Sequence, residues 1–240
     1  MVGQDLQIWH YDGTWVQSAQ FNIPNHEFGL FMDIWGSAPD DIFAIGFADS
    51  SKQRHGLIYH YNGKTWSRVN IPPMHYQFSK IRGVKGDNSK YYIMGLKNDN
   101  KAGVCDSAHI LLYNGSSFKK IFSGFFNNEE ALGLDEIDNA IYIEKGNKVY
   151  KLINNDVVFF MEYPSTNYLT GISGRSENDI LLFLDNGIAH YNGKDVAFLY
   201  KFNNPDLRVN NTFCFQNSIY LLAYDYATNF NIILKGKLNN

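Results

Sequence analysis

The sequence has few cysteines, no excess of basic side chains and no long apolar run. Only Cys105 and Cys214 occur among 240 residues, so a disulfide-stapled scaffold is excluded and both are expected to be free thiols. The net charge is −3, and Lys and Arg are scattered singly, which excludes the basic stripe that nucleic-acid binding requires. No run of about 18 apolar residues occurs, so no membrane insertion is expected.

Signals for targeting, helices and cofactors are also missing. The N-terminus, Met-Val-Gly-Gln-Asp, lacks the basic region and apolar core of a signal peptide. The compartment therefore stays open, with an extracellular or cell-surface location favoured if a signal segment has been removed. No segment carries the apolar stripe of an amphipathic helix. No phosphate-binding glycine loop, nucleophile elbow or metal-ligand spacing occurs, so neither a cofactor nor a metal is expected.

Aromatic residues are abundant instead. The chain contains 16 Tyr, 18 Phe and 4 Trp, which favour pleated, half-buried surfaces. Its 20 glycines, together with many asparagines, supply turns with positive φ. The composition therefore indicates many short strands joined by tight connections.

A hairpin motif recurs along the chain. Its clearest copies are Ile8–Trp15, Ile58–Trp66, Leu111–Phe118 and Ile188–Lys194, with degenerate copies at 150–155 and 232–237. Each copy reads as a strand, an Asn-Gly or Asp-Gly turn and a second strand. That pattern is typical of a type I′ hairpin, which needs positive φ at both central residues. The turns recur about every 38 to 52 residues.

A second motif lies between the hairpins. An apolar residue precedes a polar turn and a continuous apolar run, as in Asp33–Gly46 and Gly171–Leu182. Such runs suit strands covered on both faces. The equivalent apolar residues are Ile34, Val84, Leu134 and Ile172. One period thus holds four strands, which is the unit of a β-propeller blade.

The pattern predicts an all-β protein, a β-propeller of five four-stranded antiparallel blades forming a single domain over residues 1–240. Trp15, Trp66 and Phe118 follow the hairpin turns and are expected to pack between blades from the outermost strands. The hairpin count exceeds the number of second motifs by one. Either the N-terminal strand is an added edge, or the chain is a fragment of a longer propeller, and five closed blades are favoured.

The alternating motifs His-Tyr-Asn-Gly-x-x-Trp and Ile-x-Gly-Ser-x-x-Asp-Ile resemble the repeats of bacterial β-propeller proteins related to the Kelch and sialidase-like groups. The resemblance covers nearly the whole chain, although the third and fifth copies are eroded. It implies a fold and says little about activity, because such propellers host many functions.

Candidate functional residues lie mainly in the connectors between repeats. Histidines 10, 60 and 190 occupy equivalent repeat positions, which favours a structural role near each hairpin. The connectors vary in length and carry aromatic, amide and carboxylate groups, as sugar or peptide sites do, and two of them also carry His26 and His75. The predicted ligand-binding residues on this connector face are Asp33, Tyr76, Arg82, Phe126, Glu130 and Tyr168.

Three functions fit these observations. The leading hypothesis is a non-catalytic recognition module that binds a glycan or protein ligand on the connector face. The first alternative is a structural or protein-interaction scaffold without a small-molecule site. The second is a glycosidase or lyase at the propeller channel, with Asp33 and Glu130 as base and acid. An enzyme is the less favoured class, and the sequence leaves the oligomeric state open.

Overall fold

The computed structural model describes residues 1–50, 53–97, 107–125, 132–163 and 169–237. These residues form strands and turns, and none of them lies in a helix long and apolar enough to cross a membrane. The chain folds into two compact units, Met1–Phe126 and Asn127–Asn240.

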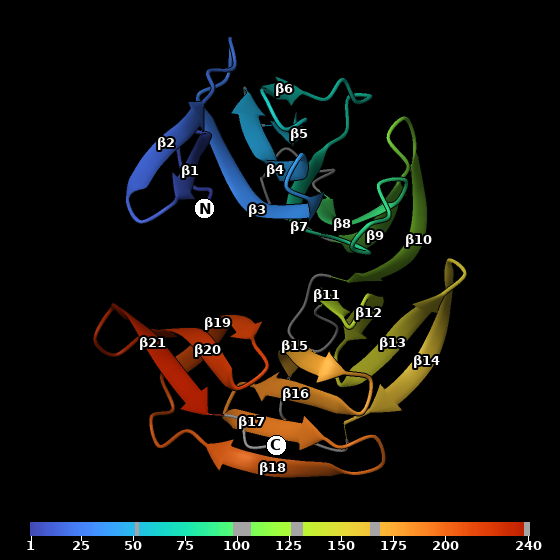
Figure 1. Ribbon diagram of the computed structural model, residues 1–240, viewed down its shortest axis with the longest axis vertical. Helices are drawn as coiled ribbons and strands as arrows, with labels where there is room; N and C mark the ends of the chain where they lie inside the picture. The colour runs from blue at the N-terminus through green and yellow to red at the C-terminus, as the bar shows by residue number, and fades with distance from the viewer. Residues whose placement is uncertain (51–52, 98–106, 126–131, 164–168, 238–240) are drawn as a thin grey trace. The chain divides into compact units, whose positions relative to one another are not determined.

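The first unit contains a two-stranded sheet followed by two four-stranded antiparallel sheets (Figure 1). The two-stranded sheet consists of β1 (Gln7–Tyr11) and β2 (Trp15–Gln20). The next sheet consists of β3 (Phe28–Ala38), β4 (Asp41–Ser50), β5 (Gln53–Tyr61) and β6 (Trp66–Arg68). The last consists of β7 (Tyr76–Gly83), β8 (Tyr91–Lys97), β9 (Ser107–Tyr113) and β10 (Phe118–Phe125).

The second unit contains three antiparallel sheets. The first consists of β11 (Leu132–Ile137), β12 (Ala140–Lys145), β13 (Lys148–Ile153) and β14 (Asp156–Glu162). The second consists of β15 (Leu169–Ser176), β16 (Asp179–Leu184), β17 (Gly187–Tyr191) and β18 (Val196–Lys201). The third consists of β19 (Leu207–Cys214), β20 (Ser218–Asp225) and β21 (Phe230–Lys237).

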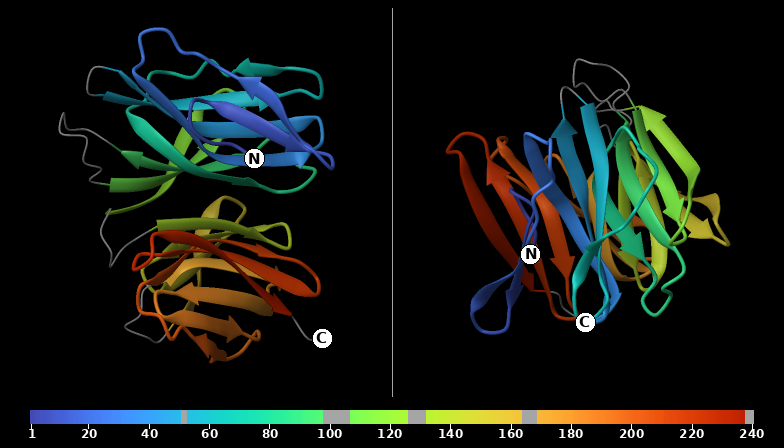
Figure 2. Two further views of the ribbon diagram at one scale, coloured as in Figure 1. Left: turned by 90° about the vertical axis from the view of Figure 1, so that its left-hand side faces the viewer. Right: turned by 90° about the horizontal axis from the view of Figure 1, so that it is seen from above.

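The fold class is a five-bladed β-propeller, as the sequence predicts. Each blade runs in simple up-and-down order, with every strand paired to the next strand of the chain. Four blades have four strands, and the fifth has three in the described part of the chain. The N-terminal hairpin β1–β2 forms its own small sheet beside the first full blade, as two views of the first unit show (Figure 2).

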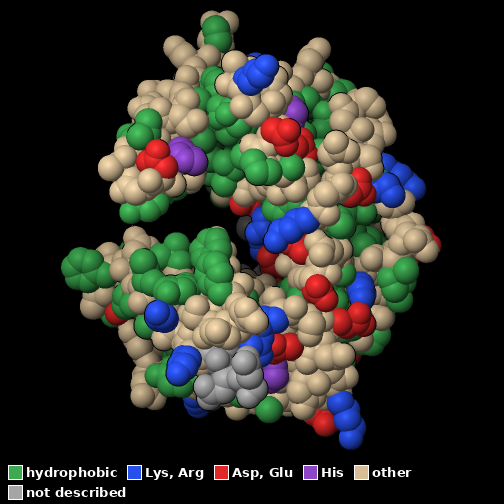
Figure 3. Space-filling view, in the orientation of Figure 1, with side chains coloured by type: hydrophobic (Ala, Val, Ile, Leu, Met, Phe, Trp, Pro, Cys, Tyr) green, Lys and Arg blue, Asp and Glu red, His purple; other side chains and the backbone are tan. Residues whose placement is uncertain are grey.

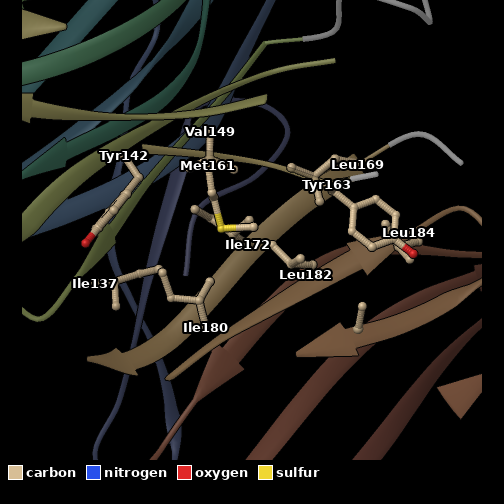
Figure 4. Packing of buried hydrophobic residues seen from close by; sticks show 11 residues of the cluster. Ile137, Tyr142, Val149, Met161, Tyr163, Leu169, Ile172, Ile180, Leu182 and Leu184 are labelled. Carbon is tan, nitrogen blue, oxygen red and sulfur yellow. The ribbon is translucent and has the colours of Figure 1, made fainter. Parts of the chain in front are cut away.

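Apolar packing between consecutive blades forms the core. In the first unit, Phe43, Ile45 and Ile58 of one blade pack against a second blade that contributes Phe78 and Ile93. In the second unit, eleven buried residues join the blade β11–β14 to the blade β15–β18. Figure 4 shows Val149, Met161, Ile172 and Leu182 of this cluster close together. Each blade therefore depends on its neighbour to bury its face.

The repeated Asn-Gly turn differs in detail from the expected type I′ turn. In the turn at 62–65, glycine alone has positive φ, at 86°, and Asn62 does not. The Asn62 side chain instead accepts hydrogen bonds from the backbone N–H groups of Lys64 and Thr65, at 3.1 and 3.0 Å. An asparagine cap of this kind closes a four-residue loop, since Tyr61 pairs with Trp66.

The degenerate copy of the hairpin forms the tighter turn. Asn154 and Asn155 both have positive φ, and the flanking residues Ile153 and Asp156 pair directly. The two-residue connection with positive φ expected for the Asn-Gly copies is therefore found in the eroded copy.

The tyrosine and histidine of the hairpin motif also have structural partners. The Tyr61 hydroxyl donates to the Gly63 carbonyl at 2.9 Å, and the equivalent Tyr191 donates to Gly193 at 2.9 Å. The Nε2 atom of His60 lies 2.8 Å from Oδ1 of Asp41, the first residue of β4. His190 lies 2.7 Å from Asp179 in the same way. The expected structural role is therefore confirmed for these two histidines.

The aromatic residues that follow the hairpin turns differ in how far they are buried. Trp66 and Phe118 are partly buried against core clusters, as expected. The prediction is wrong for Trp15, whose exposed fraction is 55% because β2 is an edge strand exposed along most of its length. Trp15 contacts Tyr11 of its own hairpin, with ring centroids 5.0 Å apart.

The second full blade departs from the predicted repeat alignment. Strand register places Ile81, not Val84, at the position of Ile34, because Ile34 pairs with Ala44 and Ile81 with Ile93 of the matching strands. The turn after Gly83 is longer than the turn after Gly36, since Gly83 pairs with Tyr91 and Gly36 with Ile42. The Gly-x-x-Gly spacing at Gly83 resembles the spacing in the other copies. Aligning the copies on this spacing therefore placed Val84, in error, at the position of Ile34.

Asp41 joins two blades, so its removal should destabilise the first unit. Its carboxylate accepts hydrogen bonds from Ser37, from His60 and, at 2.9 Å, from the Tyr91 hydroxyl of the next blade. We expect Asp41→Ala to lower the free energy of unfolding by about 2–4 kcal/mol, because hydrogen bonds to a charged acceptor are lost together. Urea denaturation measures this loss. Asp40→Ala, at an exposed neighbouring position, is the control, and an equal loss in both variants would contradict the assignment.

Candidate functional site

The blades have two chemically different ends. In the first blade, Phe28 pairs with Asp49 and Asp49 with Arg54, so the start of β3 lies with the β4–β5 loop. We call this the connector end, because the described connections β2–β3 and β6–β7 also lead into the first strands of the blades there. Tyr61 pairs with Ile42 near the Asn-Gly turn, which marks the opposite end. The repeated turns occupy one end, and the variable connectors occupy the other.

Asp33 and Arg82, two of the predicted ligand-binding residues, form an ion pair. They lie on β3 and β7, the first strands of consecutive blades, with Arg82 Nη1 2.6 Å from Asp33 Oδ2. The same carboxylate accepts hydrogen bonds from the backbone N–H groups of Ile81 and Ile34, each at 2.9 Å. Asp33 is thus held by three donors, which suits a link between blades.

Tyr76, a third predicted residue, lies at the connector end. Its hydroxyl is 2.6 Å from Nδ1 of His109, a buried histidine on β9. The Tyr76 ring also covers Gly95, where an added Cβ would lie 2.7 Å from Tyr76 Cδ1. Arg82 lies six residues further along β7, at about 3.3 Å per residue, so Tyr76 and Arg82 are at different ends of the strand.

The other three predicted residues, Phe126, Glu130 and Tyr168, lie outside the described residues. Of the six predicted positions, the structure therefore brings together Asp33 and Arg82 and places Tyr76 apart from them.

A cavity of about 460 Å³ opens at the connector end of the first unit. Its polar lining consists of Asp5, Gln20, Asn22, His26 and Glu27. Its apolar lining consists of Leu6, Phe21, Ile23, Phe28, Gly29 and Ala48. Ligand sites of this size combine ring faces with a few polar groups in the same way.

Three histidines form a row beside this cavity, which we call the histidine row: His26, His55 and His75. The ring centroids of His26 and His55 are 5.8 Å apart, and those of His55 and His75 are 5.3 Å apart. The three residues come from three separate segments: the β2–β3 connector, β5 and the β6–β7 connector.

Backbone hydrogen bonds bring these segments together. Glu27 N–H donates to the Asp49 carbonyl at 3.0 Å and fixes the first connector on β4. Gly56 N–H donates to the Met74 carbonyl at 3.2 Å and fixes the second connector beside β5. The ring of Phe78 packs where a Cβ of residue 56 would stand, 2.5 Å from its Cε2 atom, so this close approach requires glycine.

The row is electrostatically coupled. Burial lowers the pKa of His55, and the neighbouring His75, His26 and Arg68 lower it further. Asp49 acts in the opposite sense. Two ring nitrogens of the row have hydrogen-bond partners: His55 Nε2 lies 3.0 Å from Ser50 Oγ, and His26 Nδ1 lies 3.0 Å from the Pro24 carbonyl.

Arg54 links the row to the second blade. Its guanidinium donates to Gln77 Oε1 at 2.5 Å and lies 3.3 Å from Asp49 Oδ1. It also stands over the Phe47 ring, 4.9 Å from the centroid. Two blades thus contribute polar side chains to the connector end.

These groups do not form a metal centre as they stand. Across the described ranges, no group of three His, Cys, Asp or Glu side chains is placed to hold a metal ion together.

A different surface lies on the second unit. One face of the sheet β19–β21 packs against the preceding blade, and the opposite face exposes Phe213, Leu222 and Ile233 at 54, 37 and 72%. Residues on paired strands, such as Leu222 and Ile233, lie directly opposite each other. Figure 3 shows hydrophobic side chains gathered over this part of the unit.

Sequence reasoning identified His26 and His75 as connector residues but missed His55 and Arg54. The usable signal was strand direction: the loop after β4 returns to the connector end, so the first residues of β5 must lie there too. The chain offers no local motif for this grouping, because the three histidines are 29 and 20 residues apart.

Comparison with known proteins identifies the fold and no family. No protein-family model matches the chain, and no curated protein matches it. The extracellular domain of a putative hybrid two component system from B. thetaiotaomicron is similar, with 13% identity and a TM-score of 0.54 over 98% of this chain. The WD40 domain of SCAP from fission yeast has 11% identity and a TM-score of 0.51 over 91%. The chain spans 37 and 54% of those two chains, respectively.

The lowered pKa of His55 predicts how stability depends on pH. The unfolded chain binds a proton at His55 more readily than the folded chain, so stability falls as the pH drops below about 6.5. We expect His55→Gln to lose less unfolding free energy than wild type between about pH 7.5 and 5.5. Urea denaturation at both pH values measures the difference. His10→Gln, at an exposed histidine of β1, should behave like wild type, and equal losses in all three proteins would refute the coupling.

Proposed function

We propose that this chain is a non-catalytic recognition module that binds a glycan ligand at the connector end of its first unit. The observation that supports this most directly is the 460 Å³ cavity, in which Phe21 and Phe28 lie beside amide, carboxylate and imidazole groups. Ring faces stack on sugars, and polar side chains hydrogen-bond their hydroxyls.

The distribution of repeated and variable residues also supports this end of the blades. The Tyr-Asn-Gly turns use their side chains for internal hydrogen bonds, as Asn62 and Tyr61 do. The connectors have no such common task, and loops on a rigid scaffold commonly carry binding groups. Tyr76 lies at the same end of the blades, and the ion pair of Asp33 with Arg82 links the first strands of the two blades.

The extracellular setting is part of the same proposal. The similar domain from B. thetaiotaomicron is the extracellular domain of a putative hybrid two component system. A ligand-binding propeller exposed to the cell surroundings fits a glycan ligand.

The exposed apolar face of β19–β21 supports a second candidate function, the binding of a protein partner. Phe213, Leu222 and Ile233 lie on one face of this sheet. Contiguous apolar surface of this kind marks protein-interaction sites.

The glycan site can be tested by a glycan-array screen followed by affinity measurement on variants. We expect Asn22→Ala and Glu27→Gln each to weaken binding by about tenfold, the equivalent of one lost polar contact. Their melting temperatures should stay near that of wild type, because both side chains are exposed. Lys64→Ala, in the Asn-Gly turn, is the control. Loss of binding in this control, with cavity variants unaffected, would place the ligand at the opposite end.

The second candidate predicts a different set of sensitive residues. We expect the double variant Phe213→Ser, Ile233→Ser to abolish capture of a protein partner while the glycan affinity of the first unit stays unchanged. Exposed side chains are removed, so the free energy of unfolding should change by less than about 1 kcal/mol. Pull-down and denaturation measure the two effects, and unchanged capture would exclude this face.

A further inference from the structure

We propose that His26, His55 and His75 form an anion subsite that binds the carboxylate of an acidic saccharide once the imidazoles are protonated. This inference deepens the proposed function and rests on it, because it names the class of glycan and a pH-dependent subsite beside the cavity.

Geometry is the first argument. The three imidazole rings form a row in space, with neighbouring ring centroids 5.8 and 5.3 Å apart, and they come from three segments of the first unit. The repeat does not require this arrangement. At the position of His55, the next blade carries Ser107, as the pairing of His55 with Ala48 and of Ser107 with Lys97 shows. A row that folding does not demand is a candidate for binding.

Charge is the second argument. Among the residues that the structure describes, the charged groups around the row are Arg54 on β5, Arg68 on β6, Asp49 on β4, Glu27 in the β2–β3 connector and Asp5 in the adjoining cavity. These groups do not give the row a positive charge while the imidazoles are neutral. Protonation of the three histidines adds one positive charge each. Acidification therefore makes this surface more positive.

The histidines repel one another when charged, and a bound anion removes that repulsion. Burial is the main cause that lowers the pKa of His55, and the neighbouring His75 and His26 lower that pKa further. A carboxylate placed among the rings would favour the charged forms and raise the pKa of each histidine. By linkage, the affinity for the anion must rise as the pH falls.

The adjoining cavity favours a saccharide over a peptide as the carrier of the carboxylate. His26 belongs to both the row and the cavity. Asp5 and Glu27 also line the cavity, so an anionic group is repelled there, whereas neutral hydroxyls can hydrogen-bond to Gln20 and Asn22. A saccharide would match this division if its acidic sugar bound at the histidine row and its neutral sugar bound in the cavity.

The direct test is an NMR titration of the histidine rings in the full chain, with EDTA present, without and with trigalacturonate. We expect trigalacturonate to raise the pKa of His26, His55 and His75 by about 0.5 pH unit or more and to leave His10 unchanged. Its affinity should be at least about tenfold higher at pH 5.5 than at pH 7.5. The variant His26→Gln, His55→Gln, His75→Gln should lose this pH dependence, whereas His10→Gln should keep it.

Two results would overturn the inference. If trigalacturonate leaves the three pKa values unmoved, the row does not bind carboxylates. If a triglutamate peptide raises them more than trigalacturonate does, the ligand is an acidic peptide and the saccharide assignment is wrong. Neutral glycan binding tests the proposed function separately: if it still depends on Asn22 while the three pKa values stay unmoved, only the subsite is refuted, and the two failures are distinguishable.

Discussion

Face-to-face packing of consecutive sheets is the constraint on which the rest of this structure depends. The middle strands are covered on both sides: every residue from Phe43 to Ala48 on β4 is buried, as is every residue from Ile180 to Leu184 on β16. A single sheet cannot achieve this, because each of its faces needs a partner. Apolar burial therefore dictates the continuous apolar runs and leaves only the strand ends free to vary.

The side chains at the two ends of the blades have different roles. At the turn end, the same few interactions recur: an asparagine caps the turn, a tyrosine donates to the glycine carbonyl, and an aspartate pairs with a histidine, as in Asp41 with His60 and Asp179 with His190. Polar links between blades reinforce the apolar packing there, since Tyr91 reaches Asp41 and Arg175 donates to the Gln216 carbonyl. The side chains that recur from repeat to repeat are thus used in folding.

At the connector end, the segments differ from blade to blade and bring together groups that no repeat specifies. The histidine row makes this end sensitive to protonation, because imidazoles that lie close together respond to each other's charge.

The sequence by itself determined the fold class, the four-strand repeat and the structural role of His60 and His190, since periodicity and turn residues act locally. It also pointed to the connectors, and thereby to His26, His75 and Tyr76. Only the tertiary structure decided that Trp15 is exposed, that Ile81 takes the position assigned to Val84, and that Asp33 is held by Arg82. It alone placed His55 between two histidines from other segments, because backbone hydrogen bonds between distant segments, such as Gly56 to Met74, leave no periodic trace in the sequence.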